Sequence, residues 1–276
     1  MKNFSVNEDL CVLCGLCAKD CFFGIIELDE YPRLTDENKC FACQHCLAVC
    51  PTGAISILGN SPEDSTPLKG AMPSEDEVAM LIKGRRSVRS YKQEPLAPER
   101  IQKLLDTAWH APTGVNTQCV HITLVDDPES VKNLSDEIFS RLEEALENGI
   151  SEISYVEELF RMACRRKKEE GVDILFRGAP HFVLVSAPRT FPSGPADMAI
   201  FLSYFELMAQ SMGIGTLWNG ILKRVVESVL PDLKGKLGIP EDHDLGYAML
   251  FGEPEFKYQR TVERAPARVR RVKWKS

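Results

Sequence analysis

Apolar residues recur at helical spacing in the stretch that follows Pro98. The repeating positions are Ile101, Leu104, Leu105, Ala108 and Trp109. Because one face of a helix collects residues three and four apart, this spacing predicts an amphipathic helix with Pro98 in its first turn. A second helix is expected over Asp197–Met212, which is apolar on nearly every side and stops at Gly213. A helix that is apolar all round is a buried one.

Three shorter segments have the length and pattern of strands. His121–Val125 alternates weakly, Phe182–Ala187 is a continuous apolar run, and Leu245–Phe251 is a further candidate. Between the first two, Glu129–Arg166 holds helical patterns broken around Asn148–Ser151, which we interpret as a covering insertion. Helices and strands do not alternate strictly, so we predict an α+β fold rather than a doubly wound one.

A change of composition divides the chain. Asn60–Pro73 is rich in Pro, Ser and Gly and has no apolar period, as is typical of a linker. A length of 276 residues is enough for roughly two domains. We therefore expect a small domain over 1–60, a linker over 61–74 and a larger domain over 75–276.

The bulk composition indicates ordinary globular material. The chain is 44% hydrophobic and 26% charged, and it contains neither a signal-like apolar region nor an apolar run of the ~20 residues that span a bilayer. We therefore expect a cytoplasmic protein without a membrane partner.

Charge is distributed unevenly. Residues 1–66 contain four Lys or Arg against ten Asp or Glu, which accounts for nearly all of the net charge of −7, whereas residues 257–275 are basic. The basic tail lacks interleaved aromatic residues, and the acidic remainder would repel a phosphate backbone, so we expect no nucleic-acid partner. The tail is better suited to an anionic cofactor or to the acidic domain.

Eight of the ten cysteines form two runs with the spacing C-x2-C-x2-C-x3-C. The runs are Cys11, Cys14, Cys17 and Cys21, and Cys40, Cys43, Cys46 and Cys50. This spacing places four thiolates around a cubane iron–sulfur cluster. A zinc ribbon would use paired ligands, and a disulfide framework is rare in the cytosol. The pattern therefore predicts two [4Fe-4S] clusters.

Residues 1–60 resemble bacterial two-cluster ferredoxins, down to the C-P-T-G-A-I run at Cys50–Ile55. One departure is Phe22, which follows Cys21 where the family often has proline. The resemblance implies that the fourth cysteine of each run crosses to the other cluster. One cluster would then be held by Cys11, Cys14, Cys17 and Cys50, and the other by Cys40, Cys43, Cys46 and Cys21.

The larger domain opens on a basic segment, Arg85–Tyr91. Three guanidiniums and a hydroxyl within five residues can receive a phosphate, although a solvated basic turn would look the same. Three further segments follow in order. They are Ala111–Gln118 after the first helix, Gly213–Gly220 after the buried helix, and Gly246–Gly252 before the basic tail.

This order resembles the nitroreductase family over residues 75–276. The resemblance implies FMN in a groove between the two subunits of a homodimer. The family's R-x-S-x-[KR] motif matches Arg85, Ser87 and Arg89. By that match Arg85 would hold the phosphate and Arg89 would approach the pyrimidine edge of the flavin. Arg86 and Ser87 would supply nearby contacts.

Three more matches complete the expected flavin site. The N-x-Q segment matches Asn116 and Gln118, with Asn116 reaching a flavin across the dimer. The family's glycine-rich turn, whose backbone faces the flavin N5, matches Leu217, Trp218, Asn219 and Gly220. Arg260 and Arg264 would close the second side of the phosphate. The chain departs from the family at Cys119 and Val120, where Pro-Trp is common, and at Asn219, where an acidic residue is common.

No side chain stands out as a catalytic acid or base, which suits a reaction that the flavin itself carries. Cys119 is either a redox thiol beside the flavin or a small buried hydrophobe. Cys164 lies among basic residues that would lower a thiol pKa, and it is otherwise an ordinary helix residue.

The sequence therefore predicts an FMN-dependent oxidoreductase that passes electrons from two clusters to FMN and on to an electron-poor organic substrate of the nitroaromatic type. Its expected donor is reduced ferredoxin or a similar one-electron carrier, because a hydride donor needs no cluster. The alternative is a non-enzymatic relay, in which FMN passes electrons to a partner protein. An enzyme should enclose its flavin, and the insertion over 129–178 is the candidate lid.

Overall fold

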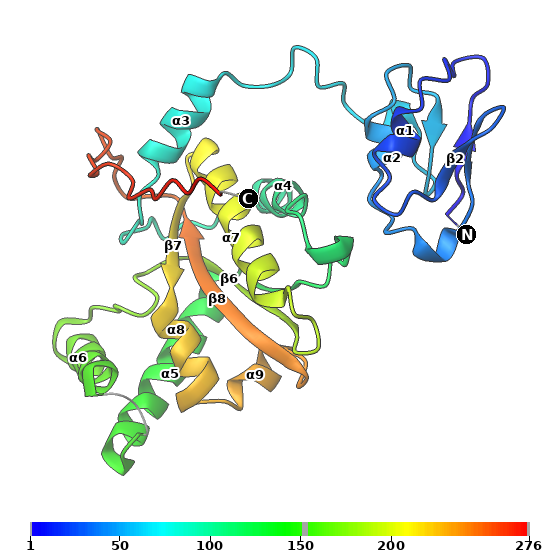
Figure 1. Ribbon diagram of the computed structural model, residues 1–276. Helices are drawn as coiled ribbons and strands as arrows, with labels where there is room; N and C mark the ends of the chain where they lie inside the picture. The colour runs from blue at the N-terminus through cyan, green and yellow to red at the C-terminus, as the bar shows by residue number, and fades with distance from the viewer. Residues whose placement is uncertain (1, 151–153, 275–276) are drawn as a thin grey trace. The chain divides into compact units, whose positions relative to one another are not determined.

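The structure is a computed structural model that describes residues 2–150 and 154–274 (Figure 1). The chain divides into two compact units: Met1–Pro73 with Thr113–Gln118, and Ser74–Pro112 with Cys119–Ser276. Both units combine helices with antiparallel strands, so the expected α+β class is confirmed. The sequence-based division differs from these units at Thr113–Gln118, which packs with residues 1–73 although it lies within the larger domain's sequence.

The small unit repeats one arrangement. Each cysteine run contains a four-residue helix, α1 (Leu16–Lys19) or α2 (His45–Ala48), which carries the third cysteine of the run. Strand β1 (Ser5–Val6) pairs with β4 (Ile55–Ser56), and β2 (Ile26–Leu28) pairs with β3 (Pro32–Leu34). The core consists of Cys17, Ile26, Cys46, Leu47, Ile55 and Ile57. A core this small rarely suffices without a metal or disulfide staple. We therefore expect bound clusters to stabilise the fold.

Short 3-10 turns complete this part of the chain. They are η1 (Glu37–Lys39), η2 (Pro62–Asp64) and η3 (Gly114–Asn116). The turn η2 lies in Asn60–Pro73, a stretch that has no other helix or strand. Among the described residues, no helix is long and apolar enough to cross a membrane.

The larger unit is built on a four-stranded antiparallel sheet with the order β5-β6-β8-β7. The strands are β5 (His121–Val125), β6 (His181–Pro188), β8 (His243–Gly252) and β7 (Gly215–Asn219). Three of them confirm the expected strands. The fourth is a correction, because residues 217–219 of the expected glycine-rich turn are strand and Gly220 opens a helix. Pairing of Trp218 with Met249 holds this segment extended.

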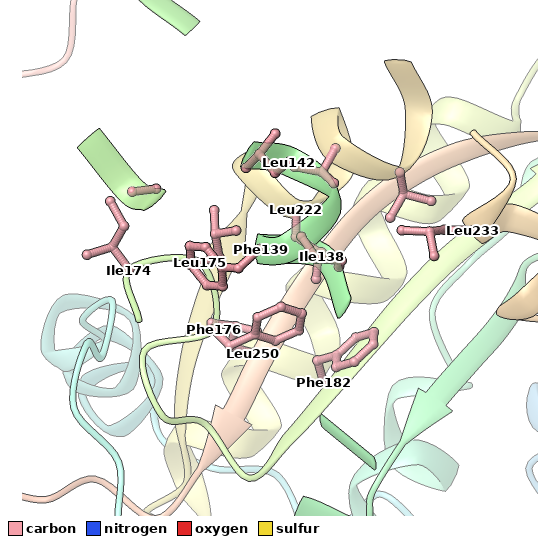
Figure 2. Packing of buried hydrophobic residues seen from close by; sticks show 14 of the residues in the cluster. Ile138, Phe139, Leu142, Ile174, Leu175, Phe176, Phe182, Leu222, Leu233 and Leu250 are labelled. Atoms are coloured by element: carbon pink, nitrogen blue, oxygen red, sulfur yellow. The ribbon is translucent and has the colours of Figure 1, made fainter. Parts of the chain in front are cut away.

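Helices cover both faces of the sheet (Figure 1). One face packs on α4 (Pro98–Ala108) and α7 (Gly194–Ser211), through strand residues such as Val183 and Met249. The other face packs on α5 (Pro128–Asn148), α8 (Gly220–Arg224), the π-helical turn η4 (Val225–Val229) and α9 (Leu233–Lys236). Figure 2 shows Phe182 and Leu250 of the sheet in this second core.

The expected helices are confirmed, including the buried one. The helix α7 buries Phe201, Leu202 and Phe205 almost completely and ends before Gly213, whose φ of +72° favours glycine. The insertion forms α5 and α6 (Ser154–Glu170), with the expected break at Gly149; Ser151 lies outside the described residues. The helix α3 (Glu75–Gly84) begins with a capping box between Ser74 and Glu77.

His181 is fully buried, and its titration should make the stability of the protein depend on pH. The Nε2 atom of His181 accepts a hydrogen bond from the Leu96 backbone N–H at 2.8 Å, and burial lowers the pKa of His181 below its ordinary 6.5. The folded state therefore prefers the neutral ring. The contribution of His181 to the free energy of unfolding should be fully present above pH 6.5 and should be lost as the pH falls below it, because the unfolded chain takes up the proton first.

Urea unfolding at a series of pH values measures this effect. His181→Gln should unfold more easily at neutral pH and should lose part of the decline below pH 6.5. His110→Gln is the matched control, because His110 is exposed. A decline that is the same in both variants would contradict the role of His181.

Candidate functional site

The two cysteine runs have the same backbone conformation. Leu13 and Gly15 in the first run have φ values of +53° and +69°, and Ala42 and Gln44 in the second have +56° and +59°. Residues other than glycine seldom adopt this region, and such strain gathers at functional sites. The turns bring the first three thiols of each run to one side, while a fourth must come from elsewhere.

The structure places the eight expected cysteines around two cavities. One is lined by Cys11, Cys14, Cys17 and Cys50, and the other by Cys21, Cys40, Cys43 and Cys46. These are the two crossed sets. Four thiols around each cavity fit an iron–sulfur cluster, whose irons take one thiolate each. The assignment of each set to a cluster remains a prediction.

The thiols in these cavities would have to lose their protons to bind iron. Burial raises the pKa of Cys46 to about 11, so the metal-free thiol is neutral at pH 7. Around Cys50, burial is outweighed by backbone N–H groups, and its pKa is lowered; the Ala54 N–H donates to Sγ at 3.2 Å. Iron binding would therefore release protons, as thiolate ligation generally does.

Asn116 contacts the second cysteine run. Its Nδ2 donates to the carbonyl oxygens of Phe41 at 2.9 Å and Ala42 at 3.2 Å, all within the small unit. Asn116 and Gln118 both have positive φ, and the Gln118 N–H donates to Thr113 Oγ1. The structure thus places Asn116 of the expected N-x-Q segment against a ligand loop. Their contact with a flavin remains a prediction.

The basic segment that begins at Arg85 lies directly beside β7. The Val88 N–H donates to the Thr216 carbonyl at 2.9 Å, and Ser87 bridges Thr216. This approach requires Gly215, because a Cβ there would lie 2.6 Å from the Val88 side chain. The structure therefore brings the Arg85–Tyr91 segment to the Gly213–Gly220 segment, as a single site that uses both would require.

A buried carboxylate orients Arg85. Glu206 on α7 is buried and accepts from Arg85 Nη1 at 3.0 Å and from Thr216 Oγ1 at 3.4 Å. Glu206 was not predicted from the sequence. The sequence feature that could have indicated Glu206 is a carboxylate in a helix that is apolar on nearly every side. A charge buried in such a helix needs a partner.

The arginines next to Arg85 have guanidinium N–H donors without a partner in the part of the chain that the structure describes. The buried Nε of Arg86 has no hydrogen-bond partner among the described residues, while its Nη2 donates to the Lys83 carbonyl. Arg89 is exposed, and Arg177 lies close to it; burial first, then repulsion from Arg89, lowers the pKa of Arg177. Neither Arg89 nor Arg177 forms an ion pair with a described carboxylate. Orphaned guanidinium donors fit the anionic groups of FMN.

Part of the basic tail lies beside the same segment. Tyr258 donates its hydroxyl to the Ser87 carbonyl at 3.1 Å. Arg260 lines a cavity of about 420 Å³ together with Gly84 and Val88. Arg264 is exposed. Arg260 thus lies beside the segment that carries Arg85, whereas Arg264 is not among the residues that line this cavity. A phosphate contact of either arginine remains a prediction.

The β7 segment has its side chains largely engaged. Trp218 meets Tyr247 edge to face at 5.5 Å between ring centroids, and Leu217 is half-buried. Asn219 is buried: its Nδ2 donates to the Leu175 carbonyl at 2.7 Å, and its Oδ1 caps α8 at the Leu222 N–H. A Cβ at Gly220 would lie 3.2 Å from Tyr247. The side chain of Asn219 is therefore fully engaged, and backbone contact of this segment with a flavin remains a prediction.

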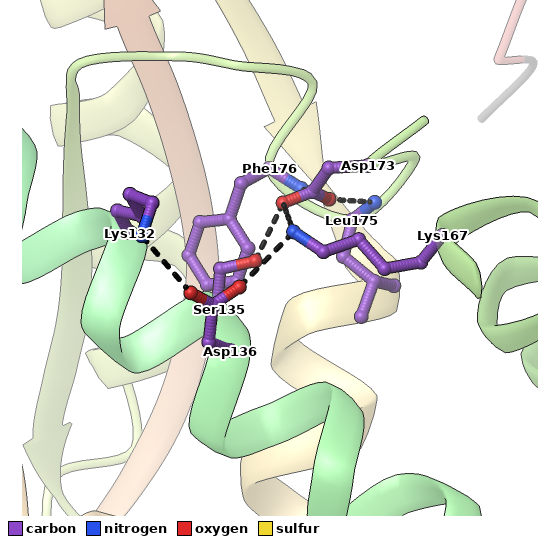
Figure 3. A network of polar contacts seen from close by, with 7 residues as sticks. All are labelled: Lys132, Ser135, Asp136, Lys167, Asp173, Leu175 and Phe176. Atoms are coloured by element: carbon purple, nitrogen blue, oxygen red, sulfur yellow. Dashed lines mark hydrogen bonds and ion pairs between the residues drawn. The ribbon is translucent and has the colours of Figure 1, made fainter. Parts of the chain in front are cut away.

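A polar network holds the loop of Asp173, Leu175 and Phe176, to which Asn219 also donates a hydrogen bond (Figure 3). Asp173 accepts from Ser135 Oγ at 2.6 Å and from the N–H groups of Leu175 and Phe176. Lys167 bridges Asp173 and Asp136. The loop that carries Arg177 is thus anchored to α5 and to β7, which keeps Arg177 near Arg89.

The two remaining cysteines differ in environment. Cys119 is half-buried. Cys164 is buried on α6, and burial raises its pKa to about 11. A thiol with this pKa is protonated at neutral pH, so the basic neighbours of Cys164 do not make it reactive.

Comparison with known families matches both parts of the chain. The nitroreductase family model matches residues 82–253, and the 4Fe-4S dicluster domain model matches residues 10–55. The resemblances stated from the sequence motifs are therefore confirmed.

Individual relatives match the two parts separately. A protein of Archaeoglobus fulgidus, provisionally named an NADH dehydrogenase/NAD(P)H nitroreductase, is 27% identical over 207 residues, 72% of this chain and 99% of its own. One subunit of an ion-translocating oxidoreductase complex from Methanosarcina acetivorans is 40% identical over 53 residues, 19% of this chain and 20% of its own.

A solved structure shares the fold of the larger unit. The nitroreductase with bound FMN from Desulfitobacterium hafniense is 26% identical, with a TM-score of 0.54, and the match covers 70% of this chain and 96% of that chain.

Proposed function

The chain belongs to the nitroreductase family, and we propose that it is an FMN-dependent oxidoreductase that takes single electrons at its cysteine-rich unit and reduces an electron-poor organic substrate. The observation that carries the proposal is the joining of two four-cysteine cavities to a flavin-type arginine segment in one chain. Bound clusters would supply one-electron exchange, and FMN would supply the conversion between single electrons and electron pairs.

The chain's own residues would bind and orient the flavin. Arg85, held by Glu206, and Arg86, with its free Nε donor, would receive the phosphate. Arg89 would approach the pyrimidine edge, where a cation stabilises the charge of a reduced ring. Arg177 beside Arg89 would add to that positive field, a residue that no sequence motif indicated.

A homodimer with a shared flavin site is part of the proposal. The described tail is exposed from Glu255 onward, and α3 exposes Val78, Met80 and Ile82. Exposed apolar residues on this scale support a partner surface. Asn116 donates through Nδ2 within its own chain, which leaves Oδ1 for the proposed contact across the dimer. A reducing cytoplasm would keep the eight thiols available.

The proposal favours a one-electron donor such as reduced ferredoxin over a nicotinamide, although the relative from Archaeoglobus fulgidus is named for NADH and NAD(P)H. Nitrobenzene reduction by the anaerobic holoprotein tests this directly. Salt of about 0.3 M should be present, so that repulsion between two acidic proteins is screened. Turnover with reduced ferredoxin should exceed turnover with NADPH.

A matched pair of variants identifies the route. Cys17→Ala/Cys46→Ala removes one thiol from each cavity and should lower ferredoxin-driven turnover at least tenfold while FMN stays bound. Cys119→Ala/Cys164→Ala should leave it unchanged. Equal ferredoxin-driven rates in both variants, or a strong preference of the intact protein for NADPH, would refute the proposed donor. Transfer to a partner protein but to no small electrophile would instead support the relay.

A further inference from the structure

The two ligand loops can be compared position by position. Cys11–Cys14 and Cys40–Cys43 have the same spacing, and each turns through a residue with positive φ, Leu13 at +53° and Ala42 at +56°. Val12 corresponds to Phe41, and Leu13 corresponds to Ala42. Differences between these positions therefore reflect what surrounds each loop, since the loops themselves have the same conformation.

The second loop is covered within the small unit. Asn116 binds the carbonyl oxygens of Phe41 and Ala42. The Phe41 ring packs against Phe23, with 4.5 Å between ring centroids, and against Phe22 at 5.9 Å. Both Phe41 and Ala42 are consequently half-buried.

The first loop presents apolar side chains to solvent. Val12 is 62% exposed and Leu13 is 50% exposed, whereas the matching Phe41 and Ala42 are half-buried. Cys14 and Cys43 are exposed in both loops, so the difference lies in the two residues between the cysteines. Leu10 and Leu16 extend the same patch, which we name the Leu10–Leu16 surface. Clustered exposed apolar residues mark interaction sites more often than chance exposure.

The charge around this surface is negative. Glu8 and Asp9 directly precede it and are exposed, and the charges of exposed Lys19 and Asp20, which follow Leu16 in the chain, offset each other. Of the four basic residues in 1–66, Arg33 and Lys39 are already paired with Glu27 and Asp36. An apolar centre with an acidic rim is complementary to a partner with an apolar centre and a basic rim.

We propose that the Leu10–Leu16 surface docks a one-electron carrier protein whose exposed redox centre is surrounded by Lys and Arg. The proposal rests on the proposed function and narrows its donor: among one-electron carriers it selects one with a basic face, rather than an acidic ferredoxin of the kind used in the turnover assay. The partner's reduced centre would be oxidised by one electron, and a cluster held by Cys11, Cys14, Cys17 and Cys50 would be reduced by it, with no proton moved and no bond formed or broken. The second loop, in which Phe41 and Ala42 are half-buried, is left for transfer onward.

Zinc-substituted cytochrome c is a suitable probe, because it has a basic face and does not exchange electrons in the dark. Calorimetric titration of the anaerobic holoprotein at about 20 mM salt should give a dissociation constant that rises roughly tenfold in Val12→Lys. Phe22→Lys is the matched control, since Phe22 is 84% exposed near the other cavity and the charge change is the same. The control should bind like the unmodified protein.

Glu8→Gln/Asp9→Asn provides a second variant outside the ligand loop and should also weaken binding, with iron content unchanged. The proposal is overturned if Phe22→Lys weakens binding as much as Val12→Lys, or if neither Val12→Lys nor the charge variant has an effect. Binding of this probe needs neither FMN nor a substrate. Failure of the proposed function would therefore show in the ferredoxin-driven assay, independently of the docking result.

Discussion

Replacing Cys21 by alanine is expected to remove about four of the about eight irons that two clusters would hold. Cys21 lines the cavity of Cys40, Cys43 and Cys46, so the loss should fall on that cavity rather than on the run in which Cys21 lies. Iron and sulfide analysis and the spin count of the reduced protein measure the effect.

Two double variants separate crossed from uncrossed ligation. Cys21→Ala/Cys46→Ala removes two thiols from one cavity and should lose no more iron than Cys21→Ala. Cys17→Ala/Cys21→Ala removes one thiol from each cavity and should lose nearly all of it. Cys119→Ala is the control and should retain all of the iron. If Cys17→Ala/Cys21→Ala kept half, each run would hold its own cluster.

Replacing Arg85 by alanine is expected to weaken FMN binding by about 2–3 kcal/mol, roughly a hundredfold, because a charge-assisted contact with the phosphate is lost. It should also destabilise the apoprotein, since Glu206 is buried and its cation would be missing. Fluorescence titration with FMN and urea unfolding measure the two effects.

A second substitution distinguishes these effects. Arg85→Ala/Glu206→Gln should recover part of the stability, because no unpaired buried charge remains, but should still bind FMN weakly. Arg141→Ala, which breaks a more exposed ion pair with Asp232 on another face, should leave FMN binding unchanged. Retention of FMN by Arg85→Ala through gel filtration would exclude Arg85 from phosphate binding.

Local signals allowed much of the fold to be predicted. The spacing of apolar residues predicted α4 and α7, because the periods of a helix depend only on neighbouring positions. The length and continuity of Phe182–Ala187 predicted a strand for the same reason. The cysteine spacing indicated cluster chemistry, since three ligands on one tight turn form a local motif.

Contacts distant in sequence could not be predicted in this way. Residues 217–219 were expected in a turn, yet β8 pairs with them and makes them strand. Asn116 was expected only at a flavin, yet its amide contacts Phe41, 75 residues away. The partner of Arg85 is Glu206, 121 residues away, and nothing near either residue in sequence indicates the pair.

The sequence by itself determined the kinds of chemistry that this protein can carry out. Thiolate runs and an arginine segment have their properties wherever the chain places them. Only the tertiary structure decided which thiols share a cavity, which arginine is held by a buried carboxylate, and which ligand loop remains exposed. These outcomes depend on burial and on pairing between distant segments, and both arise only when the chain folds.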